Sequence, residues 1–375
     1  MSRIETEEKP IKVLMVLPNL RPSNGVTNFV MNYFRGINHN EVQIDFATLS
    51  YRESPYLEEV QKVGSKVFIL PSLARHPVKH IKKCREIIEN DNYDIVHDNT
   101  LIQSIPIMWI ARKQVKARLL HSHSTKMGES GLKEGINRAF MPILINIATH
   151  YSACSTNAGK AMFGKRTFSV IPNVIDASKF LVDIKRRELV RKESQVEGKK
   201  IIGTVGRLAE PKNPFFAFDV FEEVIKLLPN VEYWWIGSGP LDEYAAQYIE
   251  KKGLGKKVHL LGSKNNMPDL YSAMDVFFLP SKFEGFGLAC IEAEAAGLPC
   301  VISSEFPQEV DLTGNVKFLP LTADKNKWAH EIISALGTNI DRVQANEICR
   351  NSSFSRNESG NILVNEYKSI IERQS

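Results

Sequence analysis

Two carboxylates that bracket a glycine-rich stretch are the first side chains in this sequence that could do chemistry. Glu284 and Glu292 have seven residues between them. An apolar run at 275–281 predicts a buried strand before them, and residues 288–297 predict a helix after the glycines. A strand, a glycine loop and a helix N-terminus form an anion site in this order, because the loop amides and the helix dipole both favour negative charge. The two carboxylates could accept hydroxyl groups of the same ligand or act as an acid–base pair.

Two more loops that follow predicted strands carry cations or glycines. Arg207 and Lys212 lie between a strand expected at 200–206 and a helix expected at 213–228. Two cations beside free helix amides are what a diphosphate needs, although the same pair would also suit a solvated surface. The turn Gly-Ser-Gly-Pro at 237–240 fits a phosphate or a base. Because ligands bind beyond the carboxyl ends of parallel strands, the three loops together predict one site.

The alternation of strands and helices predicts how these loops are held. Apolar strand patterns alternate with helical patterns in each half of the chain, which is typical of parallel sheets covered by helices. The first half is expected to have strands at 11–18, 42–46, 66–70, 94–97, 118–123, 151–155 and 169–172. The second half is expected to have strands at 200–206, 231–237, 258–262, 275–279, 299–302 and 316–319. The predicted fold class is therefore α/β, with two Rossmann-like, doubly wound parallel sheets.

Composition predicts where two domains begin and end. Residues 176–200 are rich in charge and lack apolar periodicity, as a linker would. The expected division is a flexible tail at 1–10, a first domain at 11–178, a linker at 179–199, a second domain at 200–353 and a final helix at 354–375 that crosses back to the first domain.

Charge and cysteine content narrow the class of protein. The 375 residues are 43% hydrophobic and 24% charged. Their net charge of +5 suits an acidic ligand or an anionic membrane surface as well as it suits no charged partner at all. The five cysteines are scattered without a CxxC pair, so we expect a reducing, cytoplasmic setting, no disulfide framework and no metal site. Diffuse charge without a nucleic-acid motif argues against nucleic-acid binding. The longest apolar stretch, at 140–149, is too short to span a bilayer.

These motifs together resemble the retaining nucleotide-sugar glycosyltransferases of family 4. That family has the GT-B architecture, two Rossmann-like domains with a cleft between them. The resemblance rests on Gly206-Arg207 with Lys212-Asn213, the 237–240 turn and the E-x7-E segment at 284–292. It extends over nearly the whole chain through Gly25, residues 171–176 and the last helix. Segments similar to the bacterial exopolysaccharide and capsule branch are 121–124, 152–155, 291–295 and 307–311.

The resemblance assigns a role to each of these positions. It implies that the donor diphosphate is bound by Arg207, Lys212, Gly25 and the amides near Leu288. It implies donor-sugar contacts from Glu284 and from the amides of Gly285, Phe286 and Gly287, and ribose contacts from Glu292. These roles suit the chemistry, because a cation stabilises a departing diphosphate and a carboxylate accepts two hydroxyl groups.

A histidine of the first domain is also implied near the donor sugar. His123 ends a predicted strand and is expected to be catalytic together with Glu284, with His121 as the reserve candidate. His97 ends the preceding strand and is a weaker candidate that would line the acceptor side. In the absence of the resemblance, a lone strand-end histidine is more often structural than catalytic.

Two features depart from the family pattern. The loop at 22–26 has one glycine, Gly25, where many members have two, so an ordinary strand–helix turn is the alternative there. Glu294 stands where a neutral residue is usual. We expect Glu294 to face solvent. Positions two apart on a helix do not share a face, and Glu292 lies on the face that is expected to meet the ligand.

The implied activity is that of a metal-independent, retaining hexosyltransferase without a cofactor. It would move a sugar from a nucleotide-sugar donor, expected to be a UDP-sugar, to a hydroxyl group of a glycan or lipid-linked glycan in cell-surface polysaccharide synthesis. The departing phosphate would take the acceptor proton, and Glu284 would position the sugar. The basic segments at 75–83 and 126–138 would dock a peripheral, cytoplasmic enzyme on the anionic inner face of the cell membrane, or form solvated helix faces.

Other activities would use the same groups differently. A GT-B epimerase would need acid–base residues beside the sugar C2, a phosphorylase would need a lysine for pyridoxal phosphate, and neither pattern is evident. A glycoside hydrolase also uses two carboxylates, but a helix that faces phosphate explains Glu292 better as a ribose ligand. A non-catalytic nucleotide-sugar-binding scaffold is the alternative outside the enzymes, and the intact Glu284, Arg207 and Lys212 argue against it.

Overall fold

The computed structural model describes residues 9–21, 25–50, 54–124, 131–284 and 286–373, which form two compact units. Unit 1 consists of Met1–Val174 together with Arg356–Ser375, and unit 2 is Ile175–Ser355. Along the chain, unit 2 is therefore inserted between two parts of unit 1. Each unit is built around its own parallel sheet, which confirms the predicted fold class.

The sheet of unit 1 has the order β3-β2-β1-β4-β5-β6-β7, and all neighbouring strands are parallel. Its strands are β1 (Ile11–Leu17), β2 (Val42–Thr48), β3 (Val67–Ile69), β4 (Ile95–Asp98), β5 (Ala117–Ser122), β6 (His150–Ala153) and β7 (Ser169–Val170). Strand β1 is apolar and buried from Val13 to Leu17, because helices cover a parallel sheet on both faces.

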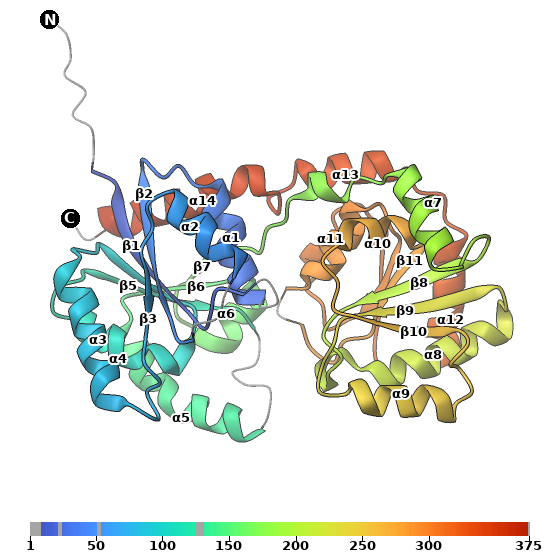
Figure 1. The fold of residues 1–375 in the computed structure, drawn as a ribbon, viewed down its shortest axis with the longest axis horizontal. Helices are drawn as coiled ribbons and strands as arrows, with labels where there is room; N and C mark the ends of the chain where they lie inside the picture. The colour runs from blue at the N-terminus through green and yellow to red at the C-terminus, as the bar shows by residue number, and fades with distance from the viewer. Residues whose placement is uncertain (1–8, 22–24, 51–53, 125–130, 285, 374–375) are drawn as a thin grey trace, which may run out of the picture. The chain divides into compact units, whose positions relative to one another are not determined.

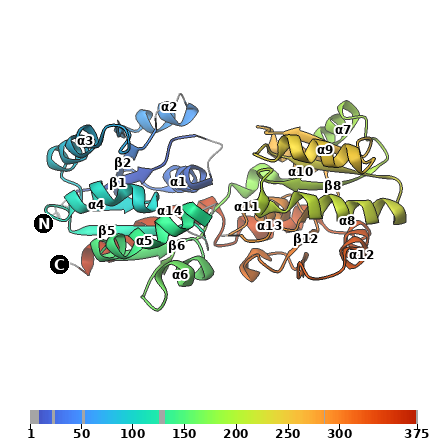
Figure 2. The ribbon, with the colours of Figure 1, turned by 90° about the horizontal axis from the view of Figure 1, so that it is seen from below.

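Helices cover both faces of this sheet (Figures 1 and 2). Helices α3, α4 and α5 lie side by side on one face, and α1 and α14 pack against each other on the other face. The helices of unit 1 are α1 (Gly25–Gly36), α2 (Pro55–Lys62), α3 (Pro77–Asn90), the 3₁₀ helix η1 (Leu101–Ser104), α4 (Ile105–Ala111), α5 (Gly131–Ile147), α6 (Thr156–Phe163) and α14 (Arg356–Glu372).

Helix α14 joins unit 1 through a close crossing with α1. A Cβ atom added to Gly360 would lie 1.8 Å from the carbonyl oxygen of Gly36, so the two backbones touch where neither residue has a side chain. Beyond this crossing, Leu363 and Tyr367 of α14 enter the core that β1 and β2 share with α1. The glycines thus allow the last helix to supply part of the unit 1 core.

The sheet of unit 2 has the order β10-β9-β8-β11-β12-β13, again with parallel neighbours. Its strands are β8 (Lys200–Val205), β9 (Val231–Ile236), β10 (Val258–Gly262), β11 (Val276–Leu279), β12 (Cys300–Ser303) and β13 (Val316–Leu319). Strands β8 and β11 lie at its centre. Large aromatic side chains, including Tyr233, Trp235 and Trp328, fill the core on one face.

Helices also cover both faces of this second sheet (Figure 1). Helices α7, α10, α11 and α13 lie on one face, and α8, α9 and α12 lie on the other. The helices are the 3₁₀ helix η2 (Ala177–Phe180), α7 (Ile184–Glu193), the 3₁₀ helix η3 (Glu210–Lys212), α8 (Pro214–Leu227), α9 (Asp242–Lys251), α10 (Met267–Ala273), α11 (Leu288–Ala295), the 3₁₀ helix η4 (Gln308–Val310), α12 (Lys325–Leu336) and α13 (Arg342–Arg350).

A helix stands where the sequence predicts a linker at 179–199. Helix α7 has no buried residue, which explains why apolar periodicity gave no sign of it. Its arginines attach it to unit 2 instead. Arg187 donates to Asp275 at 2.5 Å and to the Met274 carbonyl oxygen at 2.8 Å, and Arg191 donates to Asp275 at 3.2 Å. Charged contacts rather than an apolar stripe therefore hold this segment against α10 and β11.

The α1–α14 crossing predicts that Gly360→Ala will destabilise the protein. An added methyl group meets the Gly36 carbonyl oxygen, and overpacking of this kind costs about 2–3 kcal/mol. Gly135→Ala is the matched control, because Gly135 also lies in a unit 1 helix but has no atom within 4 Å of its added Cβ. Denaturant unfolding should give a lower free energy for Gly360→Ala and an unchanged or slightly higher one for Gly135→Ala. Equal effects of the two substitutions would contradict the crossing.

Candidate active site

Two glycine turns pack backbone against backbone at the carboxyl edge of the unit 2 sheet. A Cβ atom on Gly237 would lie 2.2 Å from the Gly206 carbonyl oxygen, and one on Gly239 would lie 2.2 Å from the Leu208 carbonyl oxygen. Gly237 also has a φ of 132°, which side chains disfavour. The turn after β9 therefore supports the loop after β8, which carries Arg207, and Gly237 and Gly239 of the turn must be glycine for this contact.

Lys212 and Glu284 form an ion pair between the loops that follow β8 and β11. The Lys212 Nζ lies 2.8 Å from Oε1 and 2.5 Å from Oε2 of Glu284. The pair is partly buried, with side-chain exposures of 21% for Lys212 and 13% for Glu284. Arg207 is an exposed residue of the same β8 loop. An ammonium group has three donors, so Lys212 can bind a phosphate oxygen while it still contacts the carboxylate.

Gly287 turns the chain into helix α11. Gly287 has a φ of 89° and is the N-cap, and a Cβ atom there would lie 2.5 Å from the Phe306 ring. Leu288 opens the helix, so its amide belongs to the first turn, whose N–H groups have no partner inside a helix. The Phe286 side chain is buried against Phe354, with ring centroids 5.0 Å apart, so only its backbone could meet a ligand. The predicted contact of Gly285 lies outside the described residues.

Glu292 is held by a tyrosine that the sequence prediction did not name. The Tyr271 hydroxyl group, from α10, lies 3.0 Å from Glu292 Oε2 and 3.1 Å from the Ala289 carbonyl oxygen. Burial raises the pKa of Glu292 to about 7, although the hydrogen bond from Tyr271 acts in the opposite direction. Glu292 is four positions after Leu288, so the carboxyl group lies on the helix face that begins at the first-turn amides.

Glu294 does not face solvent, so that expectation is wrong. Its side chain is fully buried, and Oε1 accepts hydrogen bonds from the Leu312 amide at 3.1 Å, the Thr313 amide at 3.0 Å and the Thr313 hydroxyl group at 2.7 Å. Burial raises the pKa of Glu294 to about 7. Helical spacing correctly separates it from Glu292, but protein covers both sides of α11. Glu294 therefore fixes α11 to the 311–314 loop.

In unit 1, His123 is paired with an asparagine from the neighbouring strand end. His123 Nε2 lies 2.8 Å from Asn99 Oδ1. An amide oxygen only accepts, so Nε2 carries the proton and Nδ1 is the acceptor of the neutral ring. Burial lowers the pKa of His123 to about 3, which keeps the half-buried imidazole neutral at pH 7. The sequence prediction missed Asn99, although it follows β4 at the ligand-bearing edge.

The other two candidate histidines of unit 1, His121 and His97, are core residues. His121 is fully buried and its Nδ1 lies 2.8 Å from the Ser152 hydroxyl oxygen, while its ring centroid is 4.4 Å from that of His123. His97 is also fully buried, 2.8 Å from the hydroxyl oxygen of Tyr367. The expectation that His97 lines an acceptor surface is therefore wrong, because its side chain points to the face covered by α14.

The remaining predictions have simpler outcomes. Gly25 is exposed at the start of α1, with no atom within 4 Å of an added Cβ, and residues 22–24 of its loop lie outside the described residues. Within the described part of the chain, no group of three or more His, Cys, Asp or Glu residues is arranged to hold a metal ion. Over the same residues, each helix is too short or too polar to cross a bilayer.

Two protein-family models match most of the chain. Residues 23–179 match the family model "Glycosyltransferase Family 4", and residues 185–351 match "Glycosyl transferases group 1". The chain is 30% identical over 343 residues to the Bacillus subtilis protein named "Putative glycosyltransferase EpsF", covering 86% of this chain and 87% of the relative.

A second relative and a solved structure are similar over most of the chain. The Escherichia coli "UDP-Gal:alpha-D-GlcNAc-diphosphoundecaprenol alpha-1,3-galactosyltransferase" is 27% identical over 298 residues, 75% of this chain and 76% of the relative. Anabaena HepE in complex with UDP-glucose superposes with a TM-score of 0.79 at 18% identity, over 96% of this chain and 100% of that one. The structural similarity confirms the predicted GT-B fold.

Proposed function

The chain belongs to glycosyltransferase family 4, a retaining and metal-independent family, and from this premise we propose that it transfers a sugar from a UDP-sugar to a hydroxyl group of a glycan or lipid-linked glycan acceptor. The observation that carries the proposal is the Lys212–Glu284 pair beside the N-terminus of α11. It combines a cation, a carboxylate and helix amides in one place, as a sugar diphosphate requires.

The diphosphate, the sugar and the ribose of the donor each have a matching group in unit 2. Lys212 and Arg207 offset the charge of the departing diphosphate, and the first-turn amide of Leu288 binds one of its oxygens. Glu284 and the backbone of the following loop bind the sugar hydroxyl groups, and Glu292 accepts from the ribose. The E. coli relative is named for UDP-Gal and the HepE structure contains UDP-glucose, which supports uridine as the nucleoside.

Retention requires the acceptor oxygen to approach C1 on the face from which the diphosphate departs. The bond from C1 to the phosphate oxygen breaks as the bond to the acceptor oxygen forms, and the departing phosphate takes the acceptor proton. Glu284 positions the sugar and stabilises developing positive charge. His123, kept neutral and oriented by Asn99, contributes a hydrogen bond to a sugar hydroxyl group rather than an acid.

The acceptor class rests on the relatives. The E. coli relative is named for a diphosphoundecaprenol-linked sugar, and a Staphylococcus aureus relative, 23% identical over 268 residues, is named "Capsular polysaccharide biosynthesis glycosyltransferase CapH". A role in cell-surface polysaccharide synthesis follows from these names, and a lipid-linked acceptor would bring the enzyme to the inner face of the membrane.

The activity can be tested by slow donor hydrolysis and by Lys212→Ala. The wild-type protein is expected to release UDP from one member of a UDP-sugar panel in the absence of acceptor, whereas a scaffold would bind the donor without releasing UDP. Lys212→Ala should lower the rate at saturating donor about 100-fold, because it removes a cation that stabilises the leaving group.

Lys226→Ala is the matched control for this substitution. Lys226 lies on α8 in a surface pair with Glu223 at 2.7 Å, away from the β8 and β11 loops. Its rate and unfolding temperature should equal those of the wild type. Lys212→Ala should remain folded at the assay temperature but unfold at a lower temperature, because it leaves the partly buried Glu284 carboxylate unpaired. A wild-type rate for Lys212→Ala would refute its role at the leaving group.

The raised pKa of Glu292 predicts pH-dependent donor binding. The carboxylate form, which accepts two hydroxyl groups, dominates above about pH 7 and is lost as the pH falls through that value. UDP should therefore bind the wild-type protein more weakly at pH 6 than at pH 8. Glu292→Gln should bind UDP about tenfold more weakly at pH 8, and the ratio of the two affinities should shrink at pH 6.

Isothermal titration calorimetry with UDP at pH 6 and pH 8 measures the ratio of the wild-type affinity to that of Glu292→Gln. Protonation of UDP affects both proteins equally and cancels in this ratio. Glu243→Gln, an exposed carboxylate on α9, should behave as the wild type. An affinity ratio near one at pH 8 would rule out the ribose contact.

A face of unit 1 supports the membrane part of the proposal. Helices α3, α4 and α5 lie side by side (Figure 1), and each exposes apolar side chains, while α3 also carries the exposed Lys79 and Lys82. Trp109, 55% exposed, lies under the Arg112 guanidinium at 4.5 Å. The exposed apolar residues are Val78, Ile81, Trp109, Ile136, Phe140 and Ile143. Apolar and aromatic groups mixed with cations are typical of interfacial binding to anionic lipid.

This face predicts salt-sensitive sedimentation with vesicles. The protein should sediment with vesicles rich in anionic lipid at low salt and be released at high salt, because the lysine contribution is screened. The variant Lys79→Glu with Lys82→Glu should stay in the supernatant, while Lys251→Glu in unit 2 should not differ from the wild type. Equal sedimentation of all three proteins would remove α3 from the membrane contact.

A further inference from the structure

A pocket of about 420 Å³ lies at the carboxyl edge of the unit 1 sheet, apart from every predicted site residue. Leu49 follows β2, residues 71–74 follow β3, and Gln103 lies in η1 after β4. The residues that line it are Leu49, Pro71, Ser72, Leu73, Ala74, His80 and Gln103. The volume is in the range of about 300–1,000 Å³ that is usual for small-molecule sites, and the strand ends are where α/β sheets bind ligands.

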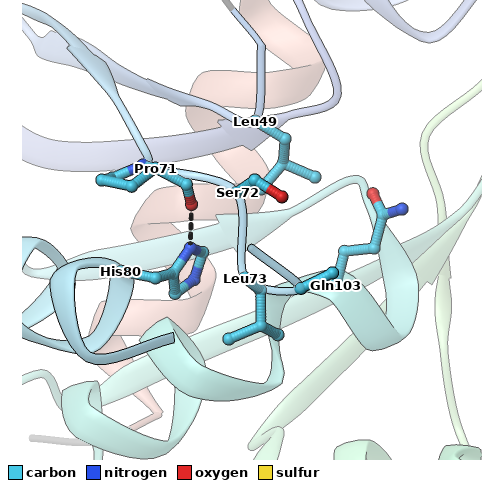
Figure 3. A pocket seen from close by; sticks show the side chains of 7 residues that line it. Leu49, Pro71, Ser72, Leu73, His80 and Gln103 are labelled. Carbon is cyan, nitrogen blue, oxygen red and sulfur yellow. Dashed lines mark hydrogen bonds between the residues drawn. The ribbon is translucent and has the colours of Figure 1, made fainter. Parts of the chain in front are cut away.

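His80 brings an unsatisfied acceptor to this pocket. Its side chain is 1% exposed, and its Nδ1 lies 2.6 Å from the Pro71 carbonyl oxygen (Figure 3). A carbonyl oxygen only accepts, so Nδ1 carries a proton, and in this tautomer Nε2 has the lone pair. Among the described residues and their hydrogen bonds, the buried Nε2 has no partner. A buried acceptor without a donor is costly, which indicates that a ligand or water supplies one.

The other walls define what that ligand looks like. Leu49, Pro71 and Leu73 provide apolar surface, and Ser72 and Gln103 provide a hydroxyl and an amide group around the same space (Figure 3). The described residues that line the pocket have no charged side chain, whereas a phosphate would call for a cation. A sugar ring has the matching surface, with C–H groups on one face and hydroxyl groups around its edge.

We propose that this pocket binds a sugar ring of the acceptor, with a sugar hydroxyl group donating to His80 Nε2. That the ring belongs to the acceptor rests on the proposed function. That a neutral sugar binds there rests on the pocket alone.

The pocket is linked to His123 through one short segment. Asn99, the partner of His123, and Gln103, which lines the pocket, are four positions apart. Asp98 fixes this segment by accepting from the Thr100 amide at 2.7 Å and the Thr100 hydroxyl group at 2.9 Å. Leu101 there has a φ of 57°, an uncommon conformation for leucine of the kind that clusters at functional sites. The sugar pocket and the candidate catalytic histidine are thus connected within unit 1 by one short, hydrogen-bonded segment.

The test uses the full chain labelled with ¹⁵N-histidine and a panel of simple sugars. The probes are the methyl glycosides of glucose, galactose, mannose and N-acetylglucosamine, each titrated in the presence of saturating UDP. One or more should shift the Nε2 resonance of His80, which is assigned by its loss in His80→Asn. A panel in which no sugar moves this resonance would overturn the proposal.

Two substitutions and a control make the test specific. His80→Asn can still donate to the Pro71 carbonyl oxygen but lacks Nε2, so it should keep the fold and bind the sugar about tenfold more weakly. Gln103→Leu should also weaken binding. His330→Asn is the control, because His330 Nδ1 likewise lies 2.7 Å from a backbone carbonyl oxygen but on the exposed face of α12. Sugar binding by His80→Asn at wild-type affinity would overturn the assignment.

Saturating UDP separates the pocket from the donor site. Sugar that is displaced by UDP binds in the donor site, and that result would also refute the proposal. The UDP-release assay distinguishes failure of the proposed transferase activity from failure of the sugar-pocket assignment. If sugar binding depends on His80 while no UDP-sugar is hydrolysed, the proposed function fails and the sugar pocket stands. If UDP is released but no sugar binds, the pocket assignment alone fails.

Discussion

The ion pair of Lys212 and Glu284 is the contact on which the candidate site of unit 2 depends. It connects the loops after β8 and β11, the two central strands of the sheet. Because the pair is partly buried, each side chain has lost part of its hydration, and the attraction between the two charges offsets that desolvation cost. A sugar diphosphate can therefore exchange one set of charge-assisted hydrogen bonds for another, and neither side chain has to be dehydrated alone when the donor arrives.

Local features of this site could be predicted from the sequence because their causes are local. The turn at Gly237 and the N-cap at Gly287 need backbone conformations that glycine alone adopts easily, and the residues around them mark the strand before and the helix after. The same holds for the parallel sheets, since apolar runs and helical periodicity are visible in short windows. Lys212 and Glu284 could be named as site residues, but their direct pairing could not, because 72 positions separate them.

The errors concern what lies opposite a residue. Periodicity put Glu294 on a different helix face from Glu292, yet it contains no information on the 311–314 loop that covers that face. Helix α7 escaped notice because arginine contacts with Asp275 replace an apolar stripe. The sequence predicted His97 as a ligand at a strand end. In the structure its side chain is hydrogen-bonded to Tyr367, which lies 270 positions later in the chain. In each case the deciding partner is remote in sequence, and local pattern cannot identify it.

The glycine crossing of α1 and α14 also sets an order of events during synthesis. Helix α14 provides Leu363 and Tyr367 to the unit 1 core, but the ribosome makes it only after all of unit 2. The core of unit 1 is therefore incomplete until α14 has been made. Unit 2 has all of its strands and helices before that point and can fold first. We therefore expect the N-terminal part of the chain to become stable last, with its β1–β2 region open to chaperones until α14 has been made.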